Sequence, residues 1–242
     1  MKRIKLNCDM GEGFGIYSLG DDTAIMPYID MANLACGFHA SDPLTMYRSI
    51  QLAQQHRVQI GCHPAYPDLV GFGRRAMACS PEEIYTLILY QLGALDGLCQ
   101  SLGTQVSYLK PHGALYNTMM QEPKVFQAIL HALKEYNPSI KLMILSTTQN
   151  HRYASVAETY GIKLLYEVFA DRGYDDHGKL IPRTQQGALL NHQEALERAQ
   201  LLLSEGVIKS INGKKLPLQA DTLCVHGDSK EALEIIKDLH AL

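Results

Sequence analysis

The stretch Val106-Ser-Tyr-Leu-Lys-Pro-His-Gly-Ala-Leu-Tyr-Asn117 starts with the half-apolar pattern of a β-strand and becomes polar around Pro111. Proline has no N–H group, so a strand ladder stops there, and Gly113 gives the following backbone the freedom to turn. Lys110 and His112 are two residues apart and share one face of an extended chain. A cation beside a titratable imidazole suits proton transfer near a developing negative charge. We therefore interpret this stretch as a strand that delivers a histidine, a glycine and an amide into a turn at the edge of a functional site.

Other segments repeat the pattern of a short apolar strand followed by a polar loop. Six of them match it, at residues 4–9, 31–36, 58–62, 141–145, 163–169 and 221–225. Between these strands, apolar residues recur at the spacing of a helix, and Asp, Ser or Asn residues suited to N-caps precede several of the expected helices. The expected helices cover residues 22–28, 43–55, 81–102, 123–136, 150–160, 191–204 and 232–239.

Seven strands that alternate with helices indicate a parallel sheet covered by helices. We predict an α/β fold, a single-domain, seven-stranded parallel (β/α) barrel over residues 1–242, with a small β-hairpin insertion near residues 207–216 around Asn212-Gly213. A doubly wound open sheet fits the same alternation, but it gathers its ligands at one crevice. Polar residues follow almost every strand here, which favours the barrel.

The composition argues against several classes of protein. With 46% hydrophobic and 19% charged residues among 242, the chain can bury a large core. The formal net charge is −3 and no basic stripe alternates with aromatic residues, so we expect no nucleic-acid partner. No apolar run approaches the roughly 20 residues that span a bilayer, so we expect a cytoplasmic protein without a membrane partner. The six cysteines form no Cys-x-x-Cys pair and are expected to be buried thiols.

Titratable side chains gather at the expected ends of the strands. In a barrel, the residues after the carboxyl ends of the strands converge on one mouth, where enzymes of this architecture keep their sites. We therefore predict one shared site formed by Asp9, Glu12, His39, Asp42, His63, Asp68, Lys110, His112, Glu167, Asp171, Arg172, His226 and Asp228.

Two kinds of chemistry fit this set of residues. Imidazoles with a carboxylate suit zinc or another divalent ion, and Asp9, His39 and His63 are the expected ligands, although the sequence has no local pair such as His-Glu-x-x-His. The other chemistry is acid–base catalysis on an amide. In that case His112 or an acidic residue activates water, while Lys110 or Arg172 stabilises the oxyanion. An alternative for the two cations is an ion pair with Asp171 or Glu167.

Nucleotide-binding motifs are missing from the sequence. The glycines of Gly11-x-Gly-x-Gly15 lack the spacing of a dinucleotide loop, and Asp9 and Glu12 would repel a pyrophosphate. The sequence contains no Gly-x-x-x-x-Gly-Lys-Ser/Thr loop. We therefore recognise no ATP site on this chain.

Several longer motifs together resemble the LamB/YcsF family, whose members form the A component of the prokaryotic 5-oxoprolinase. The resemblance covers nearly the whole chain. It rests on Leu6-Asn-Cys-Asp-Met-Gly-Glu12, Ala32-Asn-Leu-Ala-Cys-Gly-Phe-His-Ala-Ser-Asp42, Gly61-Cys-His-Pro-Ala-Tyr-Pro-Asp68, Gly71-Phe-Gly-Arg74, Lys110-Pro-His-Gly-Ala-Leu-Tyr-Asn117, Glu167-Val-Phe-Ala-Asp-Arg-Gly-Tyr174 and Val225-His-Gly-Asp228.

The resemblance implies an enzyme that opens the lactam ring of 5-oxo-L-proline to L-glutamate, with ATP as co-substrate, in a complex with subunits B and C. It also implies a barrel similar to that of the polysaccharide deacetylases. Cys8 and Cys62 stand where the family often has alanine, which argues against a thiol nucleophile. Because the phosphate loop is missing, our hypothesis is that this chain binds the small carboxylated lactam while its partners supply the other steps.

We expect catalytic roles for Asp9, Glu12, Lys110 and His112. Two other functions stay open, namely a metal-dependent deacetylase-like hydrolase of a carbohydrate and a non-catalytic subunit that carries the ligand. Contacts to the substrate are expected from His39, His63, Asn117, Asp171, Arg172, His226 and Asp228.

Overall fold

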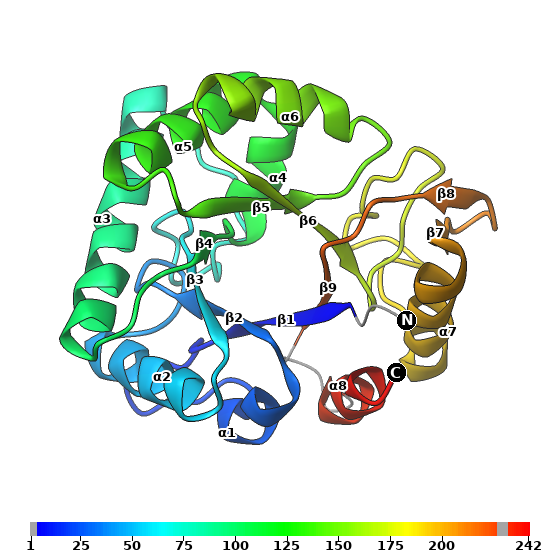
Figure 1. Ribbon diagram of the computed structural model, residues 1–242, viewed down its shortest axis with the longest axis horizontal. Helices are drawn as coiled ribbons and strands as arrows, with labels where there is room; N and C mark the ends of the chain where they lie inside the picture. Colours follow the sequence, from blue (N-terminus) through cyan, green and yellow to red (C-terminus); the bar gives the residue numbers. More distant parts are fainter. Residues whose placement is uncertain (1–3, 227–231) are drawn as a thin grey trace.

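The computed structural model describes residues 4–226 and 232–242 and forms a closed barrel of seven parallel strands (Figure 1). The predicted seven-stranded parallel barrel is confirmed. Around the barrel, the strands follow the order β1-β2-β3-β4-β5-β6-β9. Their bounds are β1 Lys5–Met10, β2 Met31–Ala35, β3 Gln59–His63, β4 Tyr108–Leu109, β5 Lys141–Leu145, β6 Leu164–Phe169 and β9 Thr222–Val225.

The strand that closes the barrel is β9. It pairs with β1 in the register Asn7↔Cys224 and with β6 in the register Glu167↔Thr222. Because every pair in the barrel is parallel, the carboxyl ends of all seven strands lie at the same end of the barrel. The side chains that follow the strands therefore meet at one mouth.

Helices surround the barrel on the outside (Figure 1). Several start where the sequence predicts, because Ser80 with Glu83 and Asn191 with Glu194 form capping boxes, and the Asp42 carboxylate caps the next helix. No helix in the described ranges is long and apolar enough to cross a membrane. The helices are α1 Asp22–Ile25, the 3-10 helix η1 Met26–Tyr28, α2 Pro43–Gln55, α3 Pro81–Ser101, α4 Gly113–Gln121, α5 Pro123–Tyr136, α6 Asn150–Thr159, α7 His192–Glu205 and α8 Ala232–His240.

The segment after His112 differs from the prediction of a turn. It forms helix α4, and the strand before it, β4, has only two residues. Pro111 ends the strand as expected, and Gly113 adopts a left-handed φ of 53°. Ala114, Leu115 and Met119 are good helix formers, and Leu115 and Met119 bury one face of the helix. Asn117 therefore lies on a helix rather than in a turn.

A β-hairpin lies outside the barrel beside α7, as the sequence predicts (Figure 1). Strands β7 Val207–Lys209 and β8 Lys215–Pro217 pair antiparallel. Gly213 takes a φ of 80° in the connecting turn. The amide of Ile211 donates to the carbonyl of Tyr174, so the hairpin is bonded to the long loop after β6.

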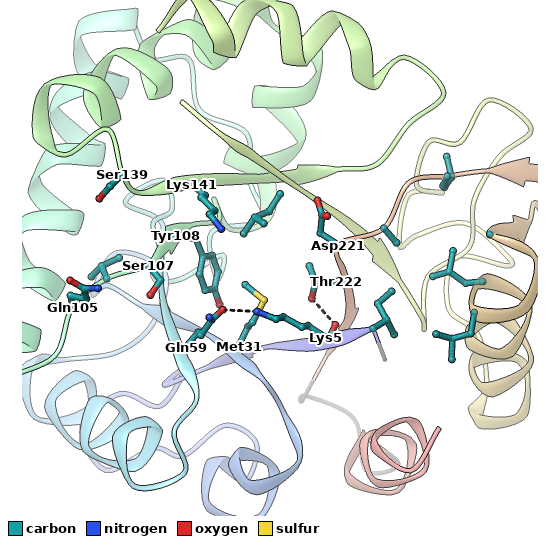
Figure 2. Close-up of a pocket in the computed structure, with 18 residues that line it drawn as sticks. Lys5, Met31, Gln59, Gln105, Ser107, Tyr108, Ser139, Lys141, Asp221 and Thr222 are labelled. Carbon is teal, nitrogen blue, oxygen red and sulfur yellow. Dashed lines mark hydrogen bonds between the residues drawn. The ribbon is translucent and has the colours of Figure 1, made fainter. Parts of the chain in front are cut away.

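The side chains that point into the barrel are more polar than those that face the surrounding helices. A large apolar cluster includes residues of all seven barrel strands and packs them against the helices, whereas Met31, Tyr108 and Met143 form a small separate cluster. At the amino ends of the strands, a cavity of about 580 Å³ is lined by Met31, Tyr108 and the surrounding loops (Figure 2). In its wall, the hydroxyl of Thr222 donates to the carbonyl of Lys5 at 2.8 Å.

Candidate active site

A second cavity, of about 490 Å³, opens at the carboxyl ends of the strands. Its walls come from the ends of β1, β3, β4 and β6, from helix α4 and from the loop after β6. The sequence predicts most of its titratable residues, since these follow the strands. The polar and aromatic residues that line it are Asp9, His63, Arg74, Lys110, His112, Tyr116, Asn117, Gln121, Phe169, Arg172, Arg183, Thr184 and His226.

Lys110 lies at the centre of the site and is only 2% exposed. Its ammonium is 3.2 Å from Asp9 Oδ1 and 3.0 Å from Glu167 Oε2. It also donates to Asn7 Oδ1 and Cys224 Sγ, each at 3.2 Å. The sequence-based alternative of an ion pair with Glu167 therefore holds for Lys110, and Asp9 is a second anionic partner.

Lys110 and Asp9 stay charged although both are buried. Burial by itself disfavours the charged form of Lys110, but Asp9, Cys224 and Glu167 oppose it and the pKa of Lys110 lies well above its ordinary value. Burial likewise opposes ionisation of Asp9, but His63 and Lys110 hold the pKa of Asp9 well below its usual range. The floor of the site therefore carries the charged ammonium of Lys110 beside the ionised carboxylate of Asp9 at neutral pH.

A hydrogen-bonded support beneath Asp9 was missed by the sequence reasoning. Asn33 Nδ2 donates to Asp9 Oδ1 at 2.7 Å, and Tyr108 Oη donates to Asn33 Oδ1 at 2.7 Å. Asn33 also donates to Asn7 Oδ1 at 2.9 Å. A single asparagine inside the apolar run 31–36 was the available signal, because a buried amide needs partners.

Three histidines and a carboxylate form a compact cluster beside Asp9. His112 Nδ1 lies 3.0 Å from His63 Nε2, and His39 Nε2 lies 3.2 Å from Glu12 Oε1. The rings of His39 and His112 stack with their centroids 3.8 Å apart. Burial, and after it the neighbouring histidines, lowers the pKa of His39 and of His112 well below the ordinary value. Both rings are therefore neutral at pH 7.

His226 and Asp171 form a separate pair on another wall of the cavity. His226 Nδ1 lies 2.8 Å from Asp171 Oδ2, and its ring stacks on Phe169 with centroids 5.5 Å apart. Burial raises the pKa of Asp171, but the contact with His226 outweighs it and the net pKa is lowered. The carboxylate therefore orients the imidazole toward the cavity.

Arg172 lines the cavity and also holds the loop after β6. Its guanidinium donates to the carbonyl of Ile181 at 2.7 Å and to that of Ala188 at 3.1 Å. The expected contact of Arg172 with a substrate stays a prediction. Arg183 from the same loop also lines the cavity, and no sequence pattern had indicated it.

Three other expected members of the site have different positions. The Asp42 side chain accepts from the amides of Leu44 and Thr45 as the cap of α2, so it serves the helix. The Asp68 carboxylate bonds the side chain of Arg75 and does not line the cavity. Asp228 lies outside the described residues.

The cysteines are thiols, as expected. All six are free, and five of them are buried. Cys36 Sγ and Cys62 Sγ lie 3.4 Å apart behind the site. Burial raises the pKa of Cys8 and Cys224 well above the ordinary value, so neither is a ready thiolate nucleophile.

Comparisons with known proteins agree with the geometry. The A component of 5-oxoprolinase from Vibrio cholerae serotype O1 is 49% identical over 99% of this chain and 97% of its own length. The third protein of that name in Pseudomonas aeruginosa is 49% identical over 99% of this chain and 96% of its own. The crystal structure of a lactam utilization protein from Thermus thermophilus superposes with a TM-score of 0.90 at 37% identity, covering 98% of this chain and 96% of that one. The model of the LamB/YcsF family matches residues 4–242, and the chain belongs to this family.

Proposed function

We propose that this chain is the A component of a 5-oxoprolinase, which opens the lactam ring of 5-oxo-L-proline to L-glutamate with ATP as co-substrate. The names of its relatives support this assignment. The observation that carries it is the buried Lys110 between Asp9 and Glu167, on the floor of a cavity of about 490 Å³. Such a floor suits a small amide whose oxygen gains negative charge during the reaction.

The walls of the cavity suit a small carboxylated lactam. The side chains of Arg74 and Arg183 line it, and a guanidinium matches the shape and charge of a carboxylate. The ring of Phe169 offers an apolar surface to the methylene groups of the lactam. We therefore assign the carboxylate to the arginine side and the amide to the Lys110 side.

Hydrolysis needs a base for the attacking water and an acid for the leaving nitrogen. Asp9 lies beside Lys110, and His112 lies beside His63 in the same cavity, so a water between Asp9 and His112 has a nearby proton acceptor. The group that takes this proton then donates it to the leaving nitrogen. The ammonium of Lys110 stabilises the oxyanion of the tetrahedral intermediate. Asn33 and Tyr108 hold Asp9 in place from below.

We assign the ATP-dependent activation to a step shared with subunits B and C. An unstrained lactam is a poor electrophile, and transfer of the γ-phosphoryl group of ATP to its oxygen makes the ring carbon more electrophilic. Water then adds to this carbon and the C–N bond breaks to give an acyl phosphate, from which a second water releases phosphate and L-glutamate. The sequence nearest to a phosphate loop is Gly173-Tyr-Asp-Asp-His-Gly-Lys-Leu180, which ends in leucine and carries two aspartates. It folds as a turn closed by the bridge between Tyr174 and Leu180, and residues 181–190 after it form no helix.

The test is ATP-dependent glutamate release from 5-oxoproline by this chain with subunits B and C, each omitted in turn. We expect release only with the complete set. In the same assay, His112→Ala lowers turnover by about 10²–10⁴-fold, the range typical of a lost acid–base group. His131→Ala is the matched control, because His131 is exposed and pairs with Glu135 on α5, away from the cavity.

Two outcomes contradict the proposal. Unchanged turnover in His112→Ala indicates a chain that carries the ligand without catalysing its reaction. Absence of glutamate with every combination of subunits favours the second candidate, a metal-dependent deacetylase-like hydrolase. The cluster of His39, His63 and His112 with Glu12 is the observation that supports this candidate.

A further inference from the structure

The cluster of Glu12, His39, His63 and His112 has the geometry of a cation site. One ligand atom from each residue lies within 4.8 Å of the other three. The three histidines are buried, and the Glu12 side chain is 10% exposed. Glu12, His39 and His112 follow strands β1, β2 and β4, and His63 is the last residue of β3. Because the four residues come from four different strands, no local sequence motif indicates the cluster.

Backbone carbonyls fix the protons on two of the imidazoles. His63 Nδ1 lies 2.7 Å from the carbonyl oxygen of Lys110, and His112 Nε2 lies 3.0 Å from that of Phe72. A carbonyl only accepts, so in the neutral tautomer of each ring the nitrogen that faces the carbonyl carries the proton. With both rings neutral, the lone pairs of His63 Nε2 and His112 Nδ1 face each other across 3.0 Å.

Oxygen atoms complete the electron-rich surface around these lone pairs. Asp9 Oδ2 lies 3.3 Å from His63 Nε2, and Glu12 Oε1 lies 3.7 Å from His112 Nδ1. His39 Nε2 lies 3.2 Å from the same Glu12 oxygen. Facing lone pairs and carboxylates repel one another unless a cation lies among them.

The separations between these atoms match the edges of a coordination tetrahedron. Zinc binds histidine nitrogen at about 2.0–2.1 Å, so two ligands of a regular tetrahedron lie about 3.3 Å apart. The distances of 3.0, 3.2 and 3.7 Å between ligand atoms of the cluster bracket this value. The carbonyl bonds of His63 and His112 are also the outer contacts that usually orient metal-binding imidazoles.

The charges near the cluster favour a divalent ion. Asp9 and Glu167 contribute two carboxylates beside the ammonium of Lys110, and Glu12 adds a third beside His39 and His112. Arg74 adds a positive charge from the exposed rim of the cavity. A divalent cation in the cluster would offset the excess negative charge in a place that water reaches poorly.

We propose that Glu12, His39, His63 and His112 bind one divalent transition-metal ion, zinc or an ion of similar preference, with Asp9 beside it. The ligand set differs from the one expected from the sequence, because Asp9 Oδ1 is held by Lys110 and Asn33 while Glu12 and His112 face the other ligands. When bound, the ion supplies a Lewis acid and lowers the pKa of a coordinated water. This inference does not rest on the proposed function. When the ion is bound, His112 is a ligand, and Asp9 is then the proton acceptor for the attacking water.

The first experiment measures metal content. The chain is produced without a polyhistidine tag, dialysed, and analysed by inductively coupled plasma mass spectrometry, and the metal-free protein is then titrated with Co²⁺ and Zn²⁺. We expect about one ion per chain, and a visible Co²⁺ spectrum of the intensity typical of four-coordinate nitrogen and oxygen ligands. A chain that retains no metal and gives only the spectrum of aqueous Co²⁺ overturns the proposal, and a shared proton then explains the contact between His63 and His112.

The second experiment locates the ion. We expect His63→Gln, His112→Gln and Glu12→Gln to weaken Co²⁺ binding by at least about 10–100-fold, because even the outer contacts of metal ligands have effects of that size. The controls are His131→Gln on the exposed face of α5 and His226→Gln in the same cavity, both of which retain the affinity. Circular dichroism checks that each variant is folded. Binding that survives in all three folded cluster variants places the metal elsewhere and overturns the proposal.

Discussion

The two ends of the barrel hold cavities of similar size, about 490 Å³ at the carboxyl ends of the strands and about 580 Å³ at the amino ends. Their chemistry differs. At the carboxyl end, Lys110 is buried between carboxylates, whereas at the amino end Lys5 and Lys141 are exposed and Lys5 bonds a glutamine side chain at 3.4 Å (Figure 2). The volume of a cavity therefore does not show whether it is a functional site, whereas buried charged side chains in contact with one another do.

The loops explain why the chemistry is at one end. Those that leave the strands include residues 11–21, 64–80 and 170–191, whereas those that enter them include residues 56–58, 102–107 and 137–140. Long loops bring side chains over the mouth and exclude water from it, while short ones leave the opposite end open. The comparison predicts that matched substitutions at the two ends have unequal effects.

The largest difference is expected between Lys110→Met and Lys141→Met. Removal of the Lys110 ammonium leaves Asp9 and Glu167 buried without a counter-charge, so we expect a loss of about 3–5 kcal/mol in the free energy of unfolding. Glutamate release by the reconstituted complex should fall by about 10²–10³-fold or more. Lys141→Met should change the free energy of unfolding by less than about 0.5 kcal/mol. Urea denaturation gives the free energies, and equal effects at the two ends contradict the comparison.

A smaller effect is expected for Tyr108→Phe, which tests the support between the two ends. Tyr108 lines the amino-end cavity, but its hydroxyl donates to Asn33 and so supports Asp9. Loss of this buried hydrogen bond should lower the free energy of unfolding by about 1–3 kcal/mol and reduce turnover. The control Tyr136→Phe removes a surface bond to Asp96 and should be near neutral. Unchanged stability in Tyr108→Phe would show that Asn33 is positioned without the tyrosine.

Asp171→Asn tests a second pair at the carboxyl end. The amide keeps the shape of the side chain but removes the charge that orients His226, so we expect a loss of about 1.5–3 kcal/mol in substrate binding or in transition-state stabilisation. Steady-state kinetics separates the two, because a change in KM alone assigns His226 to binding. If kcat and KM both stay the same, the pair of His226 and Asp171 takes no part in substrate binding or in the reaction.

The smallest effect is expected for Asp42→Ala, at the same end but outside the cavity. Hydrogen bonds from Thr45 and Gly15 lower the pKa of Asp42 to about 2. A carboxyl group with a lowered pKa in the folded state stabilises the fold above its unfolded pKa of about 3.9, and this contribution is lost as the pH falls toward 2. We expect Asp42→Ala to cost about 1 kcal/mol at pH 7 and to weaken the decline in stability between pH 4 and 2, which thermal unfolding at several pH values measures.

Sequence reasoning predicted the barrel because each strand and most helix starts carry local signals, such as the capping boxes at Ser80 and Asn191. It missed helix α4 because Pro111 and Gly113 are also the residues of a turn, and only the buried face of Leu115 and Met119 decides between the two. The rule that residues directly after a strand lie at the mouth of the barrel placed Lys110 correctly. The same rule failed for Asp42 and Asp68, which serve a helix cap and an ion pair with Arg75.

Other parts of the site depend on contacts that no local pattern records. Asn33 and Tyr108 lie within strands and contribute through side chains inside the barrel. The side chain of Arg172 donates to two carbonyl groups of the loop of residues 170–191 and so fixes its path. Arg183 reaches the cavity from this loop. The separation of His63 and His112 by 3.0 Å depends on the register of β3 and β4, which the sequence does not reveal.

The closure of the barrel by β9 has a consequence for the synthesis of the protein. The acceptors around Lys110 range along the chain from Asn7 to Cys224, and the latter belongs to the strand that pairs with β1. A nascent chain on the ribosome therefore carries Asp9, His63 and Lys110 long before the strand that closes the barrel around them. Until that strand is made, the charges of the site remain in water and the edges of β1 and β6 stay unpaired, so folding is completed late and a truncated chain is prone to aggregate.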